Sequence, residues 1–379
     1  MIAVIGCGGA GGNIADEASR VGFATGAINF SQQDLDSLEY VQLKLRIPGS
    51  EGVGHNRDEA KRLLSKHYQM CIDWIIEHFS NPSIEAIIFA TSSGGGSGSA
   101  ITPMLLDLMK QMMPDKVYSV IVATPDLSEV DISQANTLNT VEELSSLDVS
   151  IIPIDNNQIK IYHNINTKNE IYQLTNTTVI NHLANLHGYT ERASKNGTFD
   201  KRDFKTTLGT KGILVFSEFN IFSAINNTFV VSSESVADRI HDEWRKSVYV
   251  PVPNDFVTRA AVIFDGREDM LQHINHELIF SYFNQGAPID LFEGFYSSQE
   301  TNRVMTVLSG LPWITTRLTQ IDNQIENNKD KIQHIFSREN QFQAKSSNLF
   351  NKLRGTNEVE GNKSSTKVSA MDILKKYRN

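Results

Sequence analysis

The stretch whose residue types most clearly suggest chemistry is SSGGGSGSA, from Ser92 to Ala100. It stands between the apolar runs EAIIFA and ITPMLLDLM, which predict a strand followed by a helix. Glycines at such a junction let successive backbone N–H groups converge on an anion, and the positive end of the helix dipole strengthens the attraction. The pattern therefore predicts a phosphate-binding loop in which two serine hydroxyls are further donors. Its residues are Gly94, Gly95, Gly96, Ser97, Gly98 and Ser99.

A second glycine-rich stretch, IGCGGAGGN, follows the first predicted strand in the same way. Two such loops on one sheet suggest one ligand with several phosphates. The spacing also matches G-x-G-x-x-G, which would fit a nicotinamide-dependent oxidoreductase, but Asn29 stands where that site needs an acidic residue. A P-loop NTPase is poorly supported because Ala100, not Lys, follows GGGSGS. The expected ligand-binding residues of this stretch are Gly8, Gly9, Ala10, Gly11, Gly12 and Asn13.

Both loops need a sheet to position them, and the first half of the chain predicts one. Apolar runs of about five residues (IAVIG, ATGAINF, AIIFAT, VYSVIVATP and VSIIPID) alternate with amphipathic stretches, which is typical of a parallel sheet covered by helices on both faces. The predicted helices run from about 13 to 21, 57 to 79, 100 to 113 and 133 to 147. The fold class is therefore α/β, with a Rossmann-like parallel sheet.

The second half predicts a different organisation. A long helix at 168–187 connects residues 1–167 to an α+β domain at 188–312, with strands in GILVFSEF, NTFVVS and AAVIFDG and a helix around 236–246. A long C-terminal helix is expected at 313–353, and residues 354–379 form a polar, basic tail that predicts flexibility. A length of 379 residues is enough for two cores.

Composition excludes several classes of protein. The net charge of −9 gives no reason to expect a nucleic-acid-binding body. Cys7 and Cys71 lie in apolar segments, so we expect buried thiols and no disulfide framework. The ten histidines lack the spacing of metal ligands, and no residue is assigned to a metal. Without an apolar run of about 18 residues or a signal-like start, we expect a cytoplasmic protein with no stable membrane insertion.

The motifs together resemble those of the tubulin/FtsZ family. SGGGSGSAITP resembles the tubulin signature GGGTGTG-(A/S)-x-x-x-P, with serines in place of two threonines, and IGCGGAGGN resembles the first nucleotide loop of FtsZ. AINFSQQDL resembles AVNTDAQAL, which places Asn29 at the Asn position and Ser31 where Asp usually stands. EGVGHNRDEAKR resembles the third loop, GxGAGANPExGR. The resemblance implies a GTPase domain that binds GTP or GDP with a hydrated Mg²⁺.

Three further contacts to the nucleotide follow from the resemblance. VATPDLSE resembles VVTKPFxxE and places Glu129 at the ribose, although Ser133 stands where the family has Arg. IIPIDNNQI resembles IxxIPNDKL and adds Asp155 to the expected site. Tyr172 and Asn176, on the predicted connecting helix, fall at the positions that stack on guanine and hydrogen-bond to it. Taken by themselves, these two would be ordinary helix-surface residues.

The catalytic residues are also implied by resemblance. TFDKRDF resembles the NxDxxD loop, with Asp200 and Asp203 as its carboxylates and Thr198 in place of Asn. In the family this loop enters the nucleotide pocket of the next subunit and helps to activate water. Without the resemblance, both would be interpreted as solvated loop charges. The implied partner is the protein itself, in head-to-tail protofilaments that activate GTP hydrolysis.

The C-terminal tail separates the possible roles within the family. Residues 337–379 contain nine Lys or Arg and four Asp or Glu, a net charge of +5, which leaves −9 − 5 = −14 for the rest of the chain. Such a tail can contact DNA, a DNA-bound adaptor, a phage particle, an anionic membrane or a neighbouring subunit, or it can only add solubility. The long C-terminal helix and the serine signature resemble plasmid or phage tubulins of the TubZ or PhuZ type, which segregate or position DNA. An FtsZ-like division protein and a filament protein that has lost hydrolysis remain alternatives.

Overall fold

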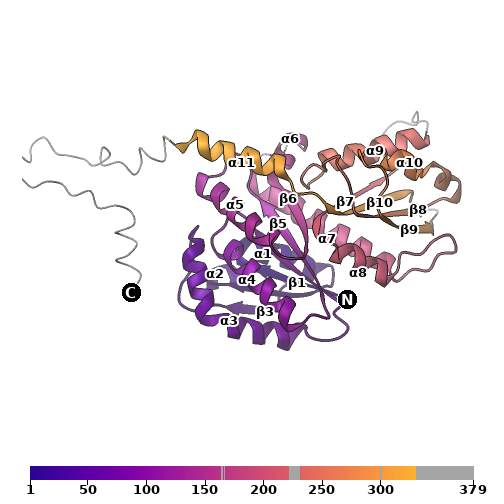
Figure 1. Cartoon of the computed structure of the whole chain (residues 1–379). Helices are drawn as coiled ribbons and strands as arrows, with labels where there is room; N and C mark the ends of the chain where they lie inside the picture. The colour runs from indigo at the N-terminus through magenta and orange to yellow at the C-terminus, as the bar shows by residue number, and fades with distance from the viewer. Residues whose placement is uncertain (164, 166, 222–230, 299–300, 330–379) are drawn as a thin grey trace, which may run out of the picture. The chain divides into compact units, whose positions relative to one another are not determined.

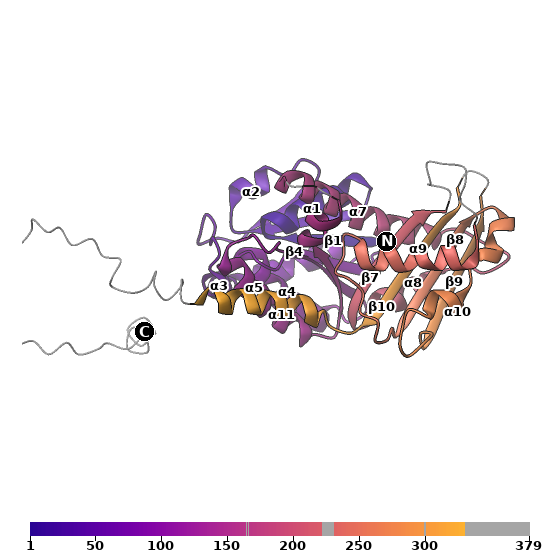
Figure 2. The same cartoon turned by 90° about the horizontal axis from the view of Figure 1, so that it is seen from above.

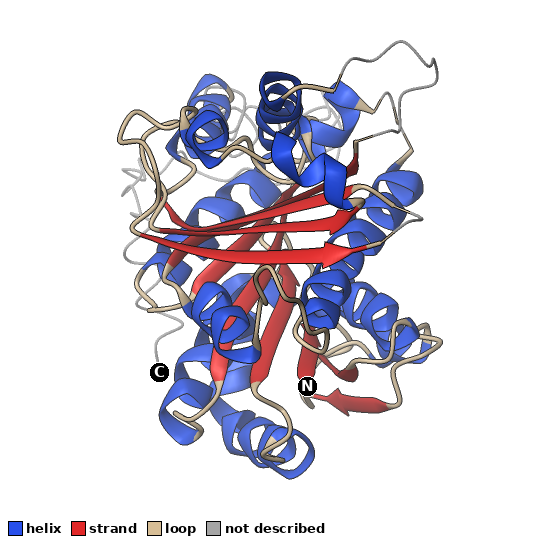
Figure 3. Cartoon of the chain, turned by 90° about the vertical axis from the view of Figure 1, so that its right-hand side faces the viewer, coloured by secondary structure: helices blue, strands red, loops and turns tan. Residues whose placement is uncertain are grey.

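The computed structural model describes residues 1–163, 165, 167–221, 231–298 and 301–329. Its centre is a ten-stranded sheet with helices on both faces (Figures 1 and 3). The strand order is β3-β2-β1-β4-β5-β6-β7-β10-β8-β9. The expected α/β fold with a Rossmann-like parallel sheet is confirmed.

The first six strands are parallel throughout, as the apolar runs predict. Every residue of β1 and β6 is buried, because a parallel sheet is covered on both faces. The strands are β1 (Ile2–Cys7), β2 (Ala24–Asn29), β3 (Leu43–Arg46), β4 (Ala86–Ser92), β5 (Val117–Thr124) and β6 (Ser150–Asp155).

The helices of this half divide between the two faces of the sheet. On one face, α1 packs on β1, β2 and β4 and contacts α7; on the other, α3, α4 and α5 pack side by side (Figure 2). The predicted helix 57–79 matches α3. The helices are α1 (Gly8–Arg20), α2 (Gln32–Asp36), α3 (Arg57–Phe79), α4 (Ser97–Met112), α5 (Asp131–Ser145), α6 (Asn156–Tyr162) and α7 (Lys168–Tyr189).

The second half continues the same sheet. β7 joins β6 through only two parallel pairs, Ser150↔Gly212 and Ile151↔Ile213, and then pairs with β10 in antiparallel fashion. β10 is antiparallel to β8, and β8 is parallel to β9. The elements are α8 (Lys201–Gly209), β7 (Gly212–Asn220), α9 (Ser233–Lys246), β8 (Arg259–Gly266), η1 (Glu268–His273), α10 (His276–Phe280), β9 (Asp290–Ser297), β10 (Arg303–Leu311) and α11 (Thr315–Asn327).

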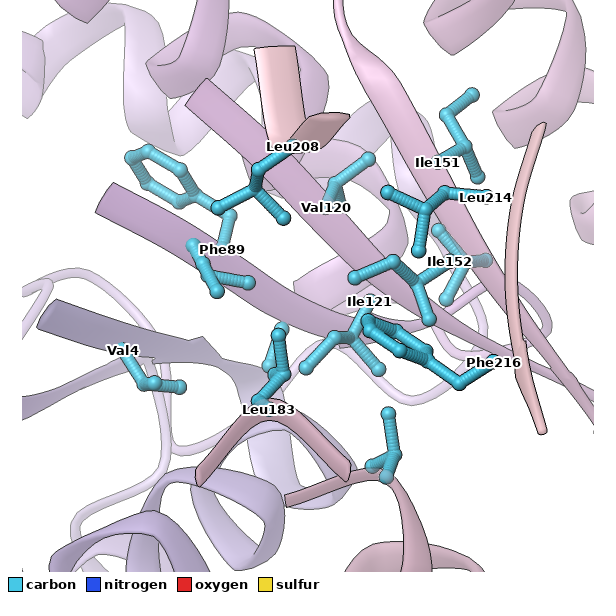
Figure 4. Close-up of a cluster of buried hydrophobic side chains, with 14 of the residues drawn as sticks. Val4, Phe89, Val120, Ile121, Ile151, Ile152, Leu183, Leu208, Leu214 and Phe216 are labelled. Carbon is cyan, nitrogen blue, oxygen red and sulfur yellow. The ribbon is translucent and has the colours of Figure 1, made fainter. Parts of the chain in front are cut away.

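The core follows the sheet across this junction. Leu183 of α7 and Leu208 of α8 are fully buried and lie beside β4, β5 and β6 (Figure 4). Phe216 of β7 belongs to the same cluster. Burial of such side chains, at about 25 cal/mol per Å² of apolar surface, stabilises both the sheet and the helices that connect its halves.

Two predictions about the second half fall partly outside the described residues. The run NTFVVS covers 227–232, of which only 231 and 232 are described, and neither is in a strand. The C-terminal helix begins at Thr315, two residues after the expected start, and its predicted continuation from 330 and the tail lie outside the description. The domain boundaries at 167, 187, 312 and 353 stay a prediction.

Candidate functional site

A pocket of about 360 Å³ opens at the carboxyl ends of β1 and β4, where the two glycine-rich stretches lie. We call it the glycine pocket. In a parallel sheet this edge is where ligands bind, because the strand-to-helix loops converge there. Its lining consists of Cys7, Gly8, Gly9, Ala10, Ser31, Asp34, Glu51, Gly52, Val53, Gly54, Ser92, Gly95, Gly96, Ser97 and Gly98.

Both glycine-rich stretches belong largely to the first turns of helices. α1 begins at Gly8 and α4 at Ser97, which is five and three residues earlier than predicted. Gly8 has φ +74°, a conformation that favours glycine, and a Cβ there would lie 2.7 Å from the backbone nitrogen of Gly98. The two helix N-termini are therefore side by side. Free N–H groups and positive dipole ends favour an anion in the pocket, and none of the described residues that line it is Lys or Arg.

Several of the predicted phosphate-binding glycines also permit close packing. A Cβ on Gly11 would lie 2.1 Å from the carbonyl oxygen of Ala90, and one on Gly98 would lie 2.2 Å from that of Cys7. Gly12 faces the side chain of Leu38 and does not line the pocket. Gly11 and Gly12 therefore let α1 approach the sheet and its neighbours, and their contact with the ligand stays a prediction.

The two signature serines have different surroundings. Ser97 lines the glycine pocket, as predicted. Ser99 is fully buried; its hydroxyl donates to Gly95 O at 2.5 Å and accepts from Nε of Arg57 at 3.1 Å. Its hydroxyl therefore has two partners within the protein, and its contact with the ligand stays a prediction. Arg57, which the motif comparison did not single out, also donates to Ser99 O and pairs with Glu143 at 2.7 Å.

Asn136 of α5 contacts the loop between β4 and α4. The Nδ2 amide of Asn136 lies within hydrogen-bonding distance of His55 O at 3.0 Å and of Gly94 O and Gly95 O at 3.2 Å each. Gly94 itself does not line the pocket, because it packs on the buried Ser133, where a Cβ would lie 3.0 Å from that of the serine. A side chain at position 94 would therefore crowd Ser133, which favours glycine there.

Asn29 acts on the pocket indirectly. The side chain is 2 % exposed, and its Nδ2 donates to Oδ2 of Asp34 at 2.9 Å while its Oδ1 accepts from the backbone of Phe30. Asp34, in the first turn of α2, does line the pocket, and its Oδ2 would lie 3.3 Å from a Cβ on Gly9. Sequence comparison missed Asp34 because it looked for the carboxylate at position 31.

A second pocket of about 160 Å³ adjoins the first, and both are lined by Ala10 and Ser92. We call it the tyrosine pocket. It brings together Asn13, Glu129, Tyr172 and Asn176, four residues that the sequence comparison had placed in one site. Ala10, also expected to bind the ligand, is part of this lining. The remaining lining residues were not predicted: Ile14, Ser92, Ala123, Pro125, Asn156 and Thr175.

The polar groups of the tyrosine pocket differ in how well they are satisfied. Oδ1 of Asn156 is buried and has no hydrogen-bond partner among the described residues, which leaves an acceptor at the pocket wall. Burial raises the pKa of the Glu129 carboxyl, and the backbone N–H of Asp126 donates to it at 3.3 Å. Tyr172 is 38 % exposed, so its ring can stack on a flat ligand.

Asp155 does not line either pocket. The carboxylate is fully buried below the tyrosine pocket, caps α6 through Asn157 N at 3.0 Å and lies 3.2 Å from Nε of Arg317. Burial raises the pKa of Asp155, and the guanidinium of Arg317 opposes that shift. The next residue, Asn156, lines the pocket, and the ligand contact of Asp155 stays a prediction.

Asp200 and Asp203 lie on the side of the sheet where the parallel strands begin, opposite the glycine pocket. They form a capping box on α8, in which Asp200 accepts from Asp203 N at 2.9 Å and Asp203 accepts from Asp200 N at 3.2 Å. α8 packs beside the amino ends of the parallel strands: Lys205 pairs with Glu85 before β4 at 3.3 Å, and Leu208 O accepts from Ser150 of β6. A strand of seven residues spans roughly 20–25 Å, so these carboxylates cannot reach the glycine pocket of their own chain.

Neither a metal cluster nor a membrane span accompanies the two pockets. Across the described ranges, three or more His, Cys, Asp or Glu side chains nowhere gather as metal ligands. None of the helices in that part of the chain is long and apolar enough to cross a membrane.

Comparison with known proteins agrees with this geometry. Residues 1–164 match the Tubulin/FtsZ family, GTPase domain. The chain is 26% identical over 325 residues to the Tubulin-like protein CetZ of Pyrococcus abyssi, covering 81% of this chain and 85% of that protein. It is 30% identical over 220 residues to the Tubulin-like protein TubZ of Clostridium botulinum C phage, covering 56% and 58%. The solved GTPγS-form protofilament of Bacillus thuringiensis serovar israelensis TubZ, at 16% identity, has the same fold, with a TM-score of 0.74 and coverage of 90% and 94%.

Proposed function

Because this chain belongs to the tubulin/FtsZ superfamily, we propose that it binds GTP and GDP across the two adjoining pockets. The phosphates occupy the glycine pocket, and the nucleoside occupies the tyrosine pocket. The observation that carries the proposal is the meeting of two helix N-termini, at Gly8 and Ser97, beside a pocket with an exposed aromatic ring. Such an anion site with an adjoining aromatic wall fits a nucleotide with several phosphates.

The nucleoside end of the site supports guanine in particular. Guanine presents two N–H donors on one edge, which need acceptors. Oδ1 of Asn156 is a buried acceptor with no protein partner among the described residues, and Asn176 lies in the same lining. The ring of Tyr172 would stack on the base, and Glu129 would accept hydrogen bonds from the ribose.

The residues around the phosphates also fit a magnesium ion. Asp34 and Glu51 place two carboxylates in a pocket built to bind anions; Glu51 pairs with Arg46, but Asp34 has no cationic partner among the described residues. Asn29 holds Asp34 in place at 2.9 Å. We propose that Asp34 would hold the ion, which when bound neutralises phosphate charge and keeps several waters of its own.

Hydrolysis would require a second subunit. The glycine pocket lies at the carboxyl ends of the strands, and Asp200 and Asp203 lie at the amino ends, so head-to-tail stacking of copies would bring one chain's carboxylates to the next chain's phosphates. Burial raises the pKa of Asp203, which makes this carboxylate a stronger proton acceptor than an ordinary aspartate. The similar TubZ of Bacillus thuringiensis is named as a protofilament, which supports this stacking. We therefore propose a filament whose GTP hydrolysis is activated by assembly.

The cellular role is proposed from the tail and the relatives. The net charge of +5 over residues 337–379 favours a contact with DNA, a DNA-bound adaptor or a phage particle, and hence the segregation or positioning of plasmid or phage DNA. The similarity to a phage TubZ supports this role. The similarity to CetZ proteins, which covers more of the chain, leaves an FtsZ-like or other cytoskeletal role in the cytoplasm as the alternative.

Calorimetric titration of the purified protein with GTP and ATP in the presence of Mg²⁺ tests the binding proposal. We expect GTP to bind at least tenfold more tightly than ATP, because the Asn156 and Asn176 acceptors can meet both N–H donor groups of the guanine edge, whereas adenine presents an acceptor, N1, in place of one of them. Asn176→Leu should lose most of this preference, whereas Asn181→Leu, on the exposed face of the same helix, should keep it. Equal affinity for GTP and ATP in the wild type would contradict the proposal.

A further inference from the structure

The C-terminal helix α11 contacts the loop that carries Glu129. This loop, residues 125–130, connects β5 to α5 and makes few backbone hydrogen bonds of its own, among them Glu129 N to Asp126 O at 3.1 Å. Gln324 of α11 donates to Leu127 O at 2.8 Å. One turn further, Asn328 donates to Oδ1 of Asp131 at 2.8 Å, where α5 begins. The loop's position therefore depends on side chains about 200 residues away in sequence.

Arg317 connects the same helix to two walls of the tyrosine pocket. It is 5 % exposed, and its Nη2 donates to Pro125 O at 2.6 Å. Its Nε lies 3.2 Å from Oδ2 of Asp155, the residue before Asn156. Because Pro125 and Asn156 both line the pocket, one guanidinium fixes the loop after β5 relative to the end of β6, where α6 begins.

The buried guanidinium is only partly satisfied in this position. Nε and Nη1 of Arg317 and Oδ2 of Asp155 have no well-aligned hydrogen bond within the described residues, although the two groups form a close ion pair. A buried charge that is incompletely paired is costly, so its presence indicates a role beyond packing. A second charged pair, Lys160 of α6 with Asp126 at 2.8 Å, holds the other side of the loop.

We propose that Arg317, Gln324 and Asn328 are positioning residues for nucleoside recognition, and that docking of α11 and binding of the nucleoside stabilise each other. The inference rests on the proposed function of the tyrosine pocket. When α11 is docked, Pro125 and Glu129 are held where the ribose would meet them; when it is not, the loop loses the contacts to Pro125 O, Leu127 O and Asp131. Linkage requires the converse, that a bound nucleoside favours the docked helix. The helix that precedes the basic C-terminal region in the sequence thereby becomes sensitive to the nucleotide.

The test compares ligands that use one or both pockets. The full-length Gln324→Ala/Asn328→Ala variant is titrated with GTP and with inorganic tripolyphosphate, which needs only the glycine pocket. We expect GTP affinity to fall about five- to twentyfold and tripolyphosphate affinity to stay within twofold of the wild type. Arg317→Met should show the same pattern more strongly if it folds. Gln320→Ala, on the exposed side of α11, is the matched control and should change neither affinity.

Hydrogen exchange of residues 315–328 supplies the reciprocal measurement. GTP should slow exchange there in the wild type at least threefold, whereas tripolyphosphate should not. A parallel loss of both affinities would show a general structural effect and overturn the inference. So would wild-type GTP affinity in the double variant. Failure of the wild type to bind GTP would instead overturn the proposed function, and the inference with it.

Discussion

Alanine substitutions at the adjacent glycines Gly95 and Gly96 should have different effects on folding stability and on GTP binding. A Cβ at Gly96 would lie 2.1 Å from Gly54 O and 2.9 Å from Asn56 N. Real Cβ atoms essentially never approach closer than 3.0 Å, so the two loops must separate by about 0.9 Å. At Gly95 the same atom would meet nothing within 4 Å, and this residue lines the pocket.

The expected magnitudes follow from these distances. Gly96→Ala should cost about 1–3 kcal/mol of folding free energy, as overpacking does, and should weaken GTP binding because both loops line the pocket. Gly95→Ala should leave stability unchanged or raise it by about 0.4–1 kcal/mol through the unfolded chain. It should nevertheless weaken GTP binding about tenfold, since its methyl group occupies space in front of the helix N-termini.

Urea denaturation and calorimetric titration of the two variants measure both quantities. A stable Gly95→Ala protein with weak GTP binding, next to a destabilised Gly96→Ala protein, is the expected pair of results. If Gly96→Ala were as stable as the wild type, the contact with Gly54 would not exist as described. If Gly95→Ala bound GTP normally, phosphates would not occupy this pocket.

Two further predictions use buried polar groups. Ser97→Ala should weaken GTP binding by about 1.5–3 kcal/mol with little loss of stability, because Ser97 lines the glycine pocket. Ser99→Ala should chiefly lower stability, because Nε of Arg57 loses its acceptor. Denaturation and titration of both variants measure whether the two effects separate in this way. His182 stacks on Tyr249, with Nδ1 2.8 Å from the tyrosine hydroxyl, and burial lowers its pKa from 6.5 to about 4. Between pH 6.5 and 4 the unfolded chain binds a proton that the folded chain does not, so the free energy of unfolding falls as the pH drops, by about 2 kcal/mol at pH 5. His182→Phe should lose this part of the pH dependence. Urea melts at pH 7.5 and 5.0 measure it.

Much of the fold could be predicted because the parallel strands are buried on both faces and appear as uninterrupted apolar runs. β1, β4, β5 and β6 are examples. β9 was missed because its sequence, DLFEGFYS, mixes exposed and buried positions and contains a glycine. The starts of α1 and α4 were placed too late because glycine is a poor helix former. At Gly11 and Gly98, close approach to neighbouring carbonyls outweighs that preference.

The candidate site was predictable where a short sequence motif carries it, and not where the contacting residues are far apart in the sequence. Glu129, Tyr172 and Asn176 come together as the motif comparison expected. The comparison chose Asp155 over Asn156, because a strand end and a helix cap are one residue apart and only the three-dimensional turn decides which side chain faces the pocket. No sequence rule pairs Arg317 with a residue 162 positions earlier.

The measurement that tests the central claim most directly is GTP turnover in mixed filaments. Asp200→Ala/Asp203→Ala should bind GTP normally and assemble, yet hydrolyse slowly and accumulate polymer, because its carboxylates act only in the neighbour's pocket. A second variant, Gly95→Val, should fail to bind GTP but keep both carboxylates. Phosphate release and sedimentation are measured for each variant and for the equimolar mixture.

The account predicts turnover in the mixture that exceeds the sum of the two separate variants, because each contributes the half that the other lacks. In the wild type, turnover per subunit should also rise with protein concentration as filaments form. A mixture that shows only the sum of its parts, or turnover by the wild type that is independent of concentration, would contradict a site completed between subunits.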